Sequence, residues 1–241
     1  MIYALDFDGV VCDSIHECFE NSYQAYLLTL GSSHLPKCPY KEWREAFYEQ
    51  RGLVRPSRNF FFLWDLIINC KEIPSDTLGF EKLALSLDKN SIRFDENLMR
   101  IRQNQILNSR EDFFEQNKPF KKVAELWAFL PKPIYVVTAK DESITQQILD
   151  FYKLSVDKVF GKGSGPKYKT LLSLAIENRV SPAEVKFVDD NPLFVSEAKA
   201  SGIDSALALW GYGPYTSELD VSLRDFEEVL DFFNNESSVS N

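Results

Sequence analysis

The chain contains 241 residues, of which 44% are hydrophobic and 14% aromatic. This composition supplies enough apolar side chains for a packed core and excludes a mainly disordered chain. The formal net charge of −9 argues against a nucleic-acid partner, because nucleic-acid-binding domains carry a basic face. A small phosphate ligand is not excluded, since a few local cations can outweigh a distant acidic surface.

The four cysteines, Cys12, Cys18, Cys38 and Cys70, are irregularly spaced and form no C-x-x-C pair. This spacing predicts neither a zinc site nor a disulfide framework, and we expect reduced thiols, most of them buried. The first apolar run is too short for a signal peptide, and no stretch is long enough to cross a bilayer. We therefore expect a soluble, cytoplasmic protein without a membrane partner. No feature of the sequence indicates an oligomeric state.

The chain begins with a short apolar run that ends at Asp6, which is typical of a buried strand in a parallel sheet. Residues 15–117 then show little strand pattern and much helical pattern. We predict that these residues form a helical insertion in a core made of residues 1–14 and 118–241. The helical stretches of the insertion are "ECFENSYQAYLLTL", "YKEWREAFYEQRG", "NFFFLWDLIINC" and "ENLMRIRQNQILNSREDFFEQN".

From residue 119 onward, strand and helix patterns alternate. This alternation predicts an α/β fold with a doubly wound, Rossmann-like parallel sheet. Pro119 suits the opening of the first helix, and Gly202 suits the end of a later one. The expected strands are 133–139, 185–190 and 203–209, and the expected helices are "PFKKVAELWAFL", "KTLLSLAIENR", "PLFVSEAKASG" and "LRDFEEVLDFFN".

Two acidic pairs stand at the ends of predicted strands: Asp6 with Asp8, and Asp189 with Asp190. Alternation along a strand places Asp6 and Asp8 on the same side of the backbone, and Gly9 permits a sharp turn after them. If the two strands are neighbours, three or four carboxylates meet at the carboxyl edge of the sheet, where ligands bind in open α/β folds. They could not all stay ionised without a cation, and oxygen ligands favour Mg²⁺.

Each acidic pair also has a purely structural interpretation. Asp6 and Asp8 could end a strand in an ordinary polar turn, and Asp189 and Asp190 could be N-cap residues of the next helix.

Two further residues favour a phosphate site. Thr138 ends the strand "IYVVT" and offers a hydroxyl donor. Lys167 follows the glycine-rich "GKGSGPK" at the opening of a helix, where a lysine can hold a phosphate beside the positive helix end.

Four segments together resemble, in order, the motifs of the haloacid dehalogenase superfamily of phosphohydrolases. They are "DFDGVVCDS", "VVTAK", the lysine of "GPKYKTLL", and "FVDDNPLFVSEAKASGI". The position and helical character of the insertion resemble the cap of the phosphoglycolate-phosphatase-like branch, as does "LWGYGP" at 209–214. The resemblance implies a core domain of residues 1–14 and 118–241 and a helical cap domain of residues 15–117.

The same resemblance implies roles for individual residues. Asp6 would be the nucleophile that forms an aspartyl-phosphate, and Asp8 would be the general acid and base. Thr138 and Lys167 would stabilise charge on the transferring phosphoryl group. Mg²⁺ would be held by Asp6, by the backbone carbonyl of Asp8 and by Asp190, with Asp189 assisting.

The sequence departs from the family pattern in its fourth motif. There the acid is commonly preceded by glycine and followed by another acid four residues later. In this chain Asp189 occupies the glycine position and Phe194 the position of the second acid. Which of Asp189 and Asp190 is the main metal ligand therefore stays open. The third-motif lysine is also open: we favour Lys167, with Lys162 and Lys169 as alternatives.

The leading hypothesis is a Mg²⁺-dependent phosphatase that acts on a small phosphorylated metabolite. A phosphomutase on the same scaffold and a non-catalytic binding protein derived from it are the alternatives. A dehalogenase is disfavoured, because it would not need Asp8.

In the insertion, arginines could clamp a substrate, although solvated helix faces explain most of them better. These arginines are Arg44, Arg51, Arg55 and Arg58.

Overall fold

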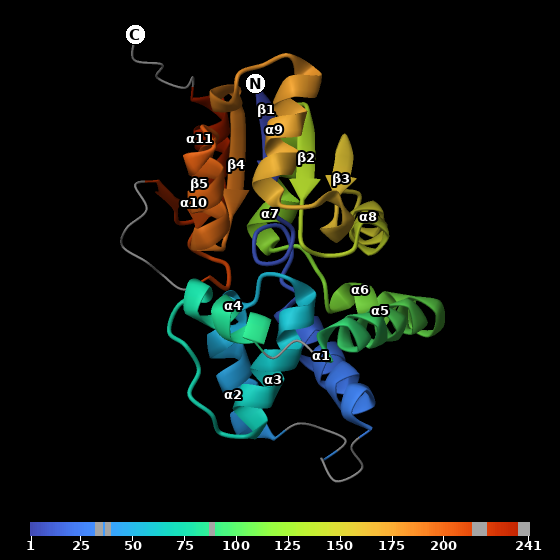
Figure 1. Ribbon diagram of the computed structural model, residues 1–241. Coiled ribbons are helices and arrows are strands. Elements are labelled where there is room, and N and C mark those ends of the chain that lie inside the picture. The colour runs from blue at the N-terminus through green and yellow to red at the C-terminus, as the bar shows by residue number, and fades with distance from the viewer. Residues whose placement is uncertain (32–35, 37–39, 87–89, 214–220, 236–241) are drawn as a thin grey trace. The chain divides into compact units, whose positions relative to one another are not determined.

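The computed structural model describes the chain except for residues 32–35, 37–39, 87–89, 214–220 and 236–241 (Figure 1). The chain divides into two compact units, Met1–Asp13 with Lys118–Asn241, and Ser14–Asn117. The first unit holds the sheet, and the second is helical.

The sheet of the first unit has six strands in the order β3-β2-β1-β4-β5-β6. Every neighbouring pair is parallel. The first strand of the chain thus lies in the middle, and β2 and β4 flank it. The strands are β1 Ile2–Leu5, β2 Ile134–Val137, β3 Lys158–Phe160, β4 Val185–Asp189, β5 Asp204–Ala208 and β6 Ser222–Leu223.

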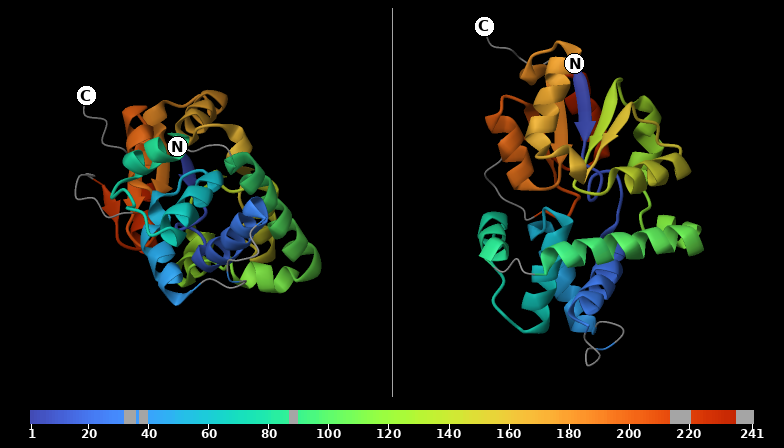
Figure 2. Two further views of the ribbon diagram at one scale, coloured as in Figure 1. Left: turned by 60° about the horizontal axis from the view of Figure 1, so that its bottom comes forward. Right: turned by 45° about the vertical axis from the view of Figure 1, so that its right-hand side comes forward.

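Helices cover both faces of this sheet (Figure 2). Successive strand residues point to opposite faces, so the apolar runs of β1 and β4 serve two hydrophobic layers. Ile2 and Phe187 pack with apolar residues of α9 and α10 on one face, while the ring of Tyr3 lies 5.0 Å from that of Phe233 on α11. The helices are α7 Lys121–Leu126, α8 Glu142–Phe151, α9 Lys167–Asn178, α10 Pro192–Ala200 and α11 Phe226–Asn234.

Short 3₁₀ helices complete the first unit. They are η3 Trp127–Phe129, η4 Lys162–Ser164 and η5 Pro182–Glu184.

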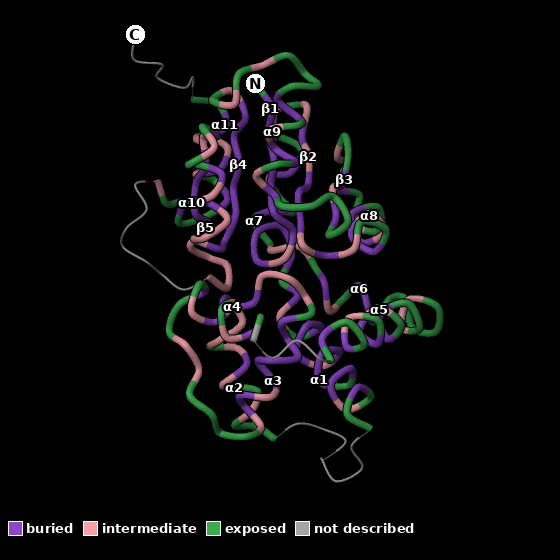
Figure 3. Tube along the Cα trace, in the orientation of Figure 1, coloured by how far each residue is buried: buried purple, intermediate pink, exposed green. Residues whose placement is uncertain are grey.

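The second unit has its own run of buried positions (Figure 3). The core that these residues form is rich in aromatic side chains. Trp64 of α3 is fully buried among the rings of Phe19, Tyr23 and Phe47. The segment "NFFFLW" at 59–64 therefore builds the core of this unit. Its helices are α1 Ile15–Leu30, α2 Lys41–Gln50, η1 Arg51–Leu53, η2 Ser57–Asn59, α3 Phe60–Ile68, α4 Thr77–Ser86, α5 Ser91–Asn108 and α6 Arg110–Glu115.

The predicted α/β fold with a parallel sheet and a helical insertion after the first strand is confirmed. Strands β3 and β6 were not predicted from the sequence, because they have only 3 and 2 residues and show no usable periodicity. The helix expected through "ENLMRIRQNQILNSREDFFEQN" is two helices that meet at Ser109.

Cys12, Cys18 and Cys70 are free thiols, and the first two are buried. Cys38 lies outside the described residues. Among the helices that the structure describes, none is both long and apolar enough to cross a bilayer.

Candidate active site

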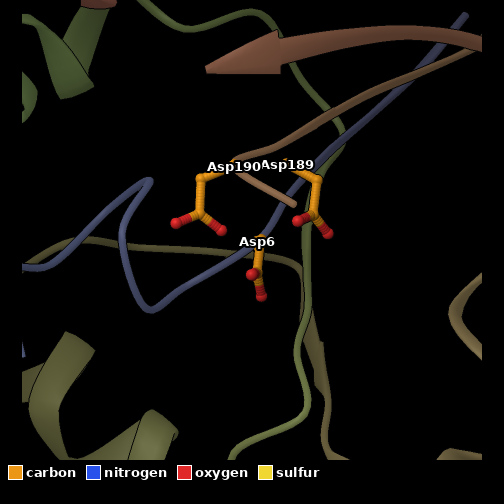
Figure 4. A group of neighbouring side chains, drawn as sticks. All are labelled: Asp6, Asp189 and Asp190. Atoms are coloured by element: carbon orange, nitrogen blue, oxygen red, sulfur yellow. The ribbon is translucent and has the colours of Figure 1, made fainter. Parts of the chain in front are cut away.

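Three carboxylates meet at the carboxyl edge of the sheet, between its two central strands (Figure 4). Because β1 and β4 are parallel with Leu5 opposite Val188, the next residues, Asp6 and Asp189, come side by side. Asp190 follows directly. One oxygen from each of the three acids lies within 4.8 Å of the others, and all three residues are buried.

Asp6 lies in the middle of this group and is 6% exposed. Burial raises the pKa of its carboxyl to about 8; Lys167 opposes this shift, and repulsion from Asp189 and Asp190 adds to it. In the metal-free chain the site thus resists carrying three negative charges at once. A bound cation would remove this restraint.

Lys167 is the cation that the fold itself supplies. Its Nζ lies 2.7 Å from Asp189 Oδ2 and 2.8 Å from Asp6 Oδ1. Burial alone would lower the pKa of Lys167, but the two carboxylates outweigh it and raise that pKa above its ordinary value. Lys167 is the first residue of α9, directly after Pro166, so the helix start directs a buried ammonium into the site.

The alternative lysines do not lie in the acidic group. Lys162 and Lys169 are both exposed, whereas Lys167 is buried. The structure therefore places Lys167 beside Asp6, and its role toward a phosphate stays a prediction.

Asp190 is held by the loop that follows β5. Its Oδ2 accepts a hydrogen bond from the backbone N–H of Tyr212 at 2.6 Å. Two glycines allow this close approach: a Cβ on Gly9 would lie 2.2 Å from Asp190 Oδ2, and a Cβ on Gly211 would lie 2.2 Å from Asp190 Cβ. Gly9 also has a φ of +84°, which side chains rarely adopt. The backbone of Gly9, Gly211 and Tyr212 therefore encloses the Asp190 carboxylate and fixes its position.

Asp8 lies near these acids but is not one of the three that converge. The strand ends at Leu5, and residues 7–12 form a turn in which the N–H groups of Val11 and Cys12 both donate to the carbonyl of Phe7. The alternation expected for a strand does not extend to Asp8. Its Oδ1 lies 3.0 Å from Nζ of Lys140, whose side chain is completely buried.

Thr138 follows β2 directly, at the same edge of the sheet as the acids, and is 4% exposed. Its backbone N–H donates to the carbonyl of Phe160, and its Oγ1 accepts from the N–H of Lys140 at 3.2 Å. The hydroxyl hydrogen thus remains available to a ligand oxygen. The turn also fixes the backbone of Lys140.

The acidic group has the chemistry of a divalent metal site. All its donors are carboxylate oxygens, which Mg²⁺ and Ca²⁺ prefer. Asp6 Oδ1 is buried, and within the described part of the chain no aligned hydrogen-bond donor reaches it apart from the ion pair with Lys167. Asp6 and Asp190 could together hold a cation, and the backbone carbonyl of Asp8 remains a predicted ligand.

Sequence reasoning missed two supports of this site. Lys140 stands two residues after Thr138 in the segment "VVTAK", where a charged residue directly after a buried strand was a usable signal. Tyr212 lies in the segment "LWGYGP", whose two glycines signal a close backbone approach. Pro214 of that segment lies outside the described residues.

The arginines of the helical unit mostly contact its own residues. Arg44 lies 3.9 Å from Glu20 and Arg55 lies 3.5 Å from Glu81. Arg51 donates to the carbonyl of Val54. Exposed Arg58 borders a pocket with an empty volume of about 470 Å³, which is also lined by Pro56, Asn59, Phe62, Glu81, Ala84 and Leu85.

No family model and no curated protein sequence matches the chain. Solved structures do match it over nearly their whole length. A hydrolase of the haloacid dehalogenase-like family from Streptococcus pneumoniae is 17% identical, with a TM-score of 0.63, and the match covers 96% of this chain and 97% of that one. A protein from Haemophilus somnus, described as a predicted phosphoglycolate phosphatase, is 16% identical with a TM-score of 0.66 and coverage of 95% and 96%.

The Protein Tyrosine Kinase A of Mycobacterium tuberculosis is also similar, at 18% identity and a TM-score of 0.63, over 97% of this chain and 98% of that one. The fold of this chain is therefore that of the haloacid dehalogenase-like hydrolases. Because a neighbour named as a kinase shares it, the activity has to be argued from the site.

Proposed function

We propose that the protein is a Mg²⁺-dependent phosphatase that hydrolyses a small phosphate monoester through an aspartyl-phosphate on Asp6. The observation that carries this proposal is the arrangement around Asp6. The buried carboxylate of Asp6 lies close to buried Lys167 and to Asp190, whose carboxylate is fixed by the backbone N–H of Tyr212. Another acid, Asp8, is held separately by Lys140. In this proposal residues 15–117 act as a cap domain that selects the leaving group.

In the first step, a carboxylate oxygen of Asp6 attacks phosphorus and the bond from phosphorus to the ester oxygen breaks. Asp8, in its protonated form, gives its proton to the leaving oxygen, so the alcohol departs neutral. Lys167 and the hydroxyl of Thr138 contact the oxygens of the transferring group. Their fixed positions stabilise the charge that spreads over these oxygens.

In the second step, a water molecule attacks the phosphorus of the aspartyl-phosphate. Asp8, now ionised, takes the proton of this water, and the bond between phosphorus and Asp6 breaks. Inorganic phosphate leaves, and both acids return to their starting forms. Splitting one displacement into two lets a single site serve the alcohol and the water in turn.

Asp6, Asp190 and the backbone carbonyl of Asp8 would hold Mg²⁺. When bound there, Mg²⁺ neutralises the gathered negative charge and lets the phosphate approach the nucleophile. The residues of the chain then need only to orient the phosphoryl group and to move the proton.

A small phosphorylated metabolite is the substrate class we propose, with a phosphoglycolate-like monoester as its most specific form. The suggestion rests on the sequence resemblance and on structural neighbours described as phosphoglycolate phosphatases. The proposed roles of the core residues concern only the phosphate group. The identity of the alcohol therefore has to be determined by experiment.

A panel of phosphorylated metabolites, incubated with the protein and Mg²⁺ and again with EDTA, tests this function. We expect release of inorganic phosphate from a small monoester, and loss of that release in EDTA. An isomerised sugar phosphate in place of inorganic phosphate would instead identify a phosphomutase. No turnover, together with no rise in melting temperature from Mg²⁺ and fluoroberyllate, would indicate a non-catalytic protein.

A further inference from the structure

A pocket in the helical unit shares no residue with the proposed active site. It has an empty volume of about 470 Å³, and all its lining residues belong to the unit Ser14–Asn117. Buried Phe62 of α3 and buried Ala84 of α4 give it apolar surface, which exposed Leu85 extends. Arg58 and Asn59 add polar groups where η2 meets α3. The pocket thus combines an apolar wall with two hydrogen-bonding side chains.

Asn59 is a buried residue whose side-chain amide is not used by the fold. It directly precedes α3, where an asparagine commonly caps the helix, but its side chain makes no capping hydrogen bond. Within the described part of the chain this amide has no hydrogen-bond partner, although the residue is only 6% exposed. Neither amide atom is among the unpartnered atoms that are sealed from solvent in the described chain, so its small exposed part includes the amide. A polar ligand in the pocket would satisfy it.

Arg58 gives the pocket a positive charge. Its side chain is exposed, and among the residues that the structure describes no carboxylate forms an ion pair with it. The pocket is also lined by Glu81, which lies 3.5 Å from Arg55, so a neighbouring guanidinium offsets the charge of that carboxylate. The charge of Arg58 therefore favours an anion in the pocket.

Two side-chain contacts fix the walls of the pocket. Oγ of Ser57 donates to Oδ1 of Asp95 at 2.6 Å, which ties η2 to α5. The pair of Arg55 and Glu81 ties the segment before η2 to α4. Because these walls are already held in place, a ligand has little of the chain to order when it binds.

We propose that this pocket binds a small monocarboxylate with a short, branched apolar body. The planar guanidinium of Arg58 matches the two oxygens of a carboxylate, and the amide of Asn59 donates to one of them. The apolar body lies against Phe62, Ala84 and Leu85. This binding site does not depend on the proposed phosphatase activity.

The test uses three probes: isovalerate, its neutral analogue isovaleramide, and acetate. Each is titrated against the whole protein in EDTA, and binding is followed by saturation-transfer NMR of the methyl groups of the probe. The variants are R58M and N59A, and neither side chain has an ion pair or hydrogen bond within the described chain to lose. The control is R93M, because Arg93 is another exposed arginine of the same unit and does not line the pocket.

We expect isovalerate to bind with a Kd of about 1 mM or tighter. R58M should weaken this binding at least about tenfold and N59A about fivefold, which are ordinary contributions of hydrogen bonds to a charged group. R93M should leave it unchanged. Isovaleramide should bind at least about tenfold more weakly because it lacks the charge. Acetate should bind at least about fivefold more weakly because it lacks most of the apolar body.

Three results would overturn the inference: no binding of isovalerate, equal binding of isovalerate and isovaleramide, or equal losses in R58M and R93M. A second titration of isovalerate contains saturating inorganic phosphate and Mg²⁺. We expect unchanged binding of isovalerate, because the phosphate should occupy the site at Asp6. Displacement of isovalerate would place this probe in that site and would also overturn the inference. Since no readout uses turnover, a protein that proves inactive as a phosphatase would refute only the proposed function.

Discussion

Nζ of Lys140 lies 3.0 Å from Oδ1 of Asp8, and no part of the lysine side chain is exposed to solvent. A buried ammonium needs a counter-charge, so this pair fixes the orientation of the Asp8 carboxylate. The two catalytic acids of the proposal are thus held by different lysines, Asp6 by Lys167 and Asp8 by Lys140.

Replacing Lys140 by methionine should therefore impair proton transfer more than phosphate binding. We expect kcat to fall at least about tenfold for an alkyl phosphate, while KM changes little. For p-nitrophenyl phosphate, whose leaving group needs no proton, the loss should be much smaller. Steady-state kinetics of K140M and of the charge-conserving K140R check this. Equal losses on both substrates would contradict an orienting role for Lys140.

The close packing of Gly211 against Asp190 gives a prediction about metal binding. In G211A the new Cβ would lie 2.2 Å from Asp190 Cβ, so the carboxylate must shift. We expect Mg²⁺ binding to weaken at least about tenfold, measured by the rise in melting temperature on adding Mg²⁺. The control is G163A, because a Cβ on Gly163 meets nothing within 4 Å. Unchanged Mg²⁺ binding in G211A would show that the position of the Asp190 carboxylate does not determine metal binding.

Asp6 gives a prediction for the metal-free protein. Its carboxyl has a pKa of about 8 in the folded chain, against an ordinary value of 3.8. Between about pH 4 and pH 8 the unfolded chain has lost this proton while the folded chain keeps it, so the free energy of unfolding falls as the pH rises. D6N cannot ionise and should escape this loss.

In EDTA at pH 8, D6N should therefore melt at a higher temperature than wild type, by several degrees if the difference exceeds about 1 kcal/mol. At pH 4 to 5 the two proteins should melt at similar temperatures. Thermal unfolding across this pH range is the measurement. A wild-type melting temperature that rises steadily towards pH 8, relative to D6N, would show the opposite linkage.

The helical unit depends on a buried ion pair between α1 and α5. Arg102 donates from Nε and Nη2 to the two carboxylate oxygens of Glu17, at 2.6 and 2.9 Å, and both side chains are buried. In R102M the carboxylate of Glu17 loses this partner, which we expect to cost about 3–5 kcal/mol of stability. Urea unfolding measures it. K41M, which breaks an exposed pair with Glu45, should leave stability unchanged, and similar effects of both variants would contradict the prediction.

Much of the fold could be predicted from the sequence because its long elements carry strong periodicity. The apolar runs before Asp6 and Asp189 are short, but both end in acids, which gives their ends a sharp boundary. The strand at Lys158–Phe160 has an exposed first residue and only one fully buried residue, so no pattern marks it. Its place in the sheet is decided by pairing with β2, which is a tertiary property.

The acids of the site could be found from the sequence, but their partners could not. Asp6 and Asp189 are far apart in the chain, and only parallel pairing of their strands shows that they are neighbours. That Asp8 turns to Lys140 and Asp189 to Lys167 depends on side-chain directions after the strands end. Such directions are set by packing and by turn geometry, which periodicity does not encode.

The most direct test of the whole account is the turnover of D6N in the presence of Mg²⁺, measured on the best monoester from the metabolite panel. We expect kcat to fall by about a thousandfold or more, in a protein that is folded and, without metal, at least as stable as wild type at pH 8. Turnover within about tenfold of wild type would contradict the account, because the oxygen that attacks phosphorus would then not belong to Asp6.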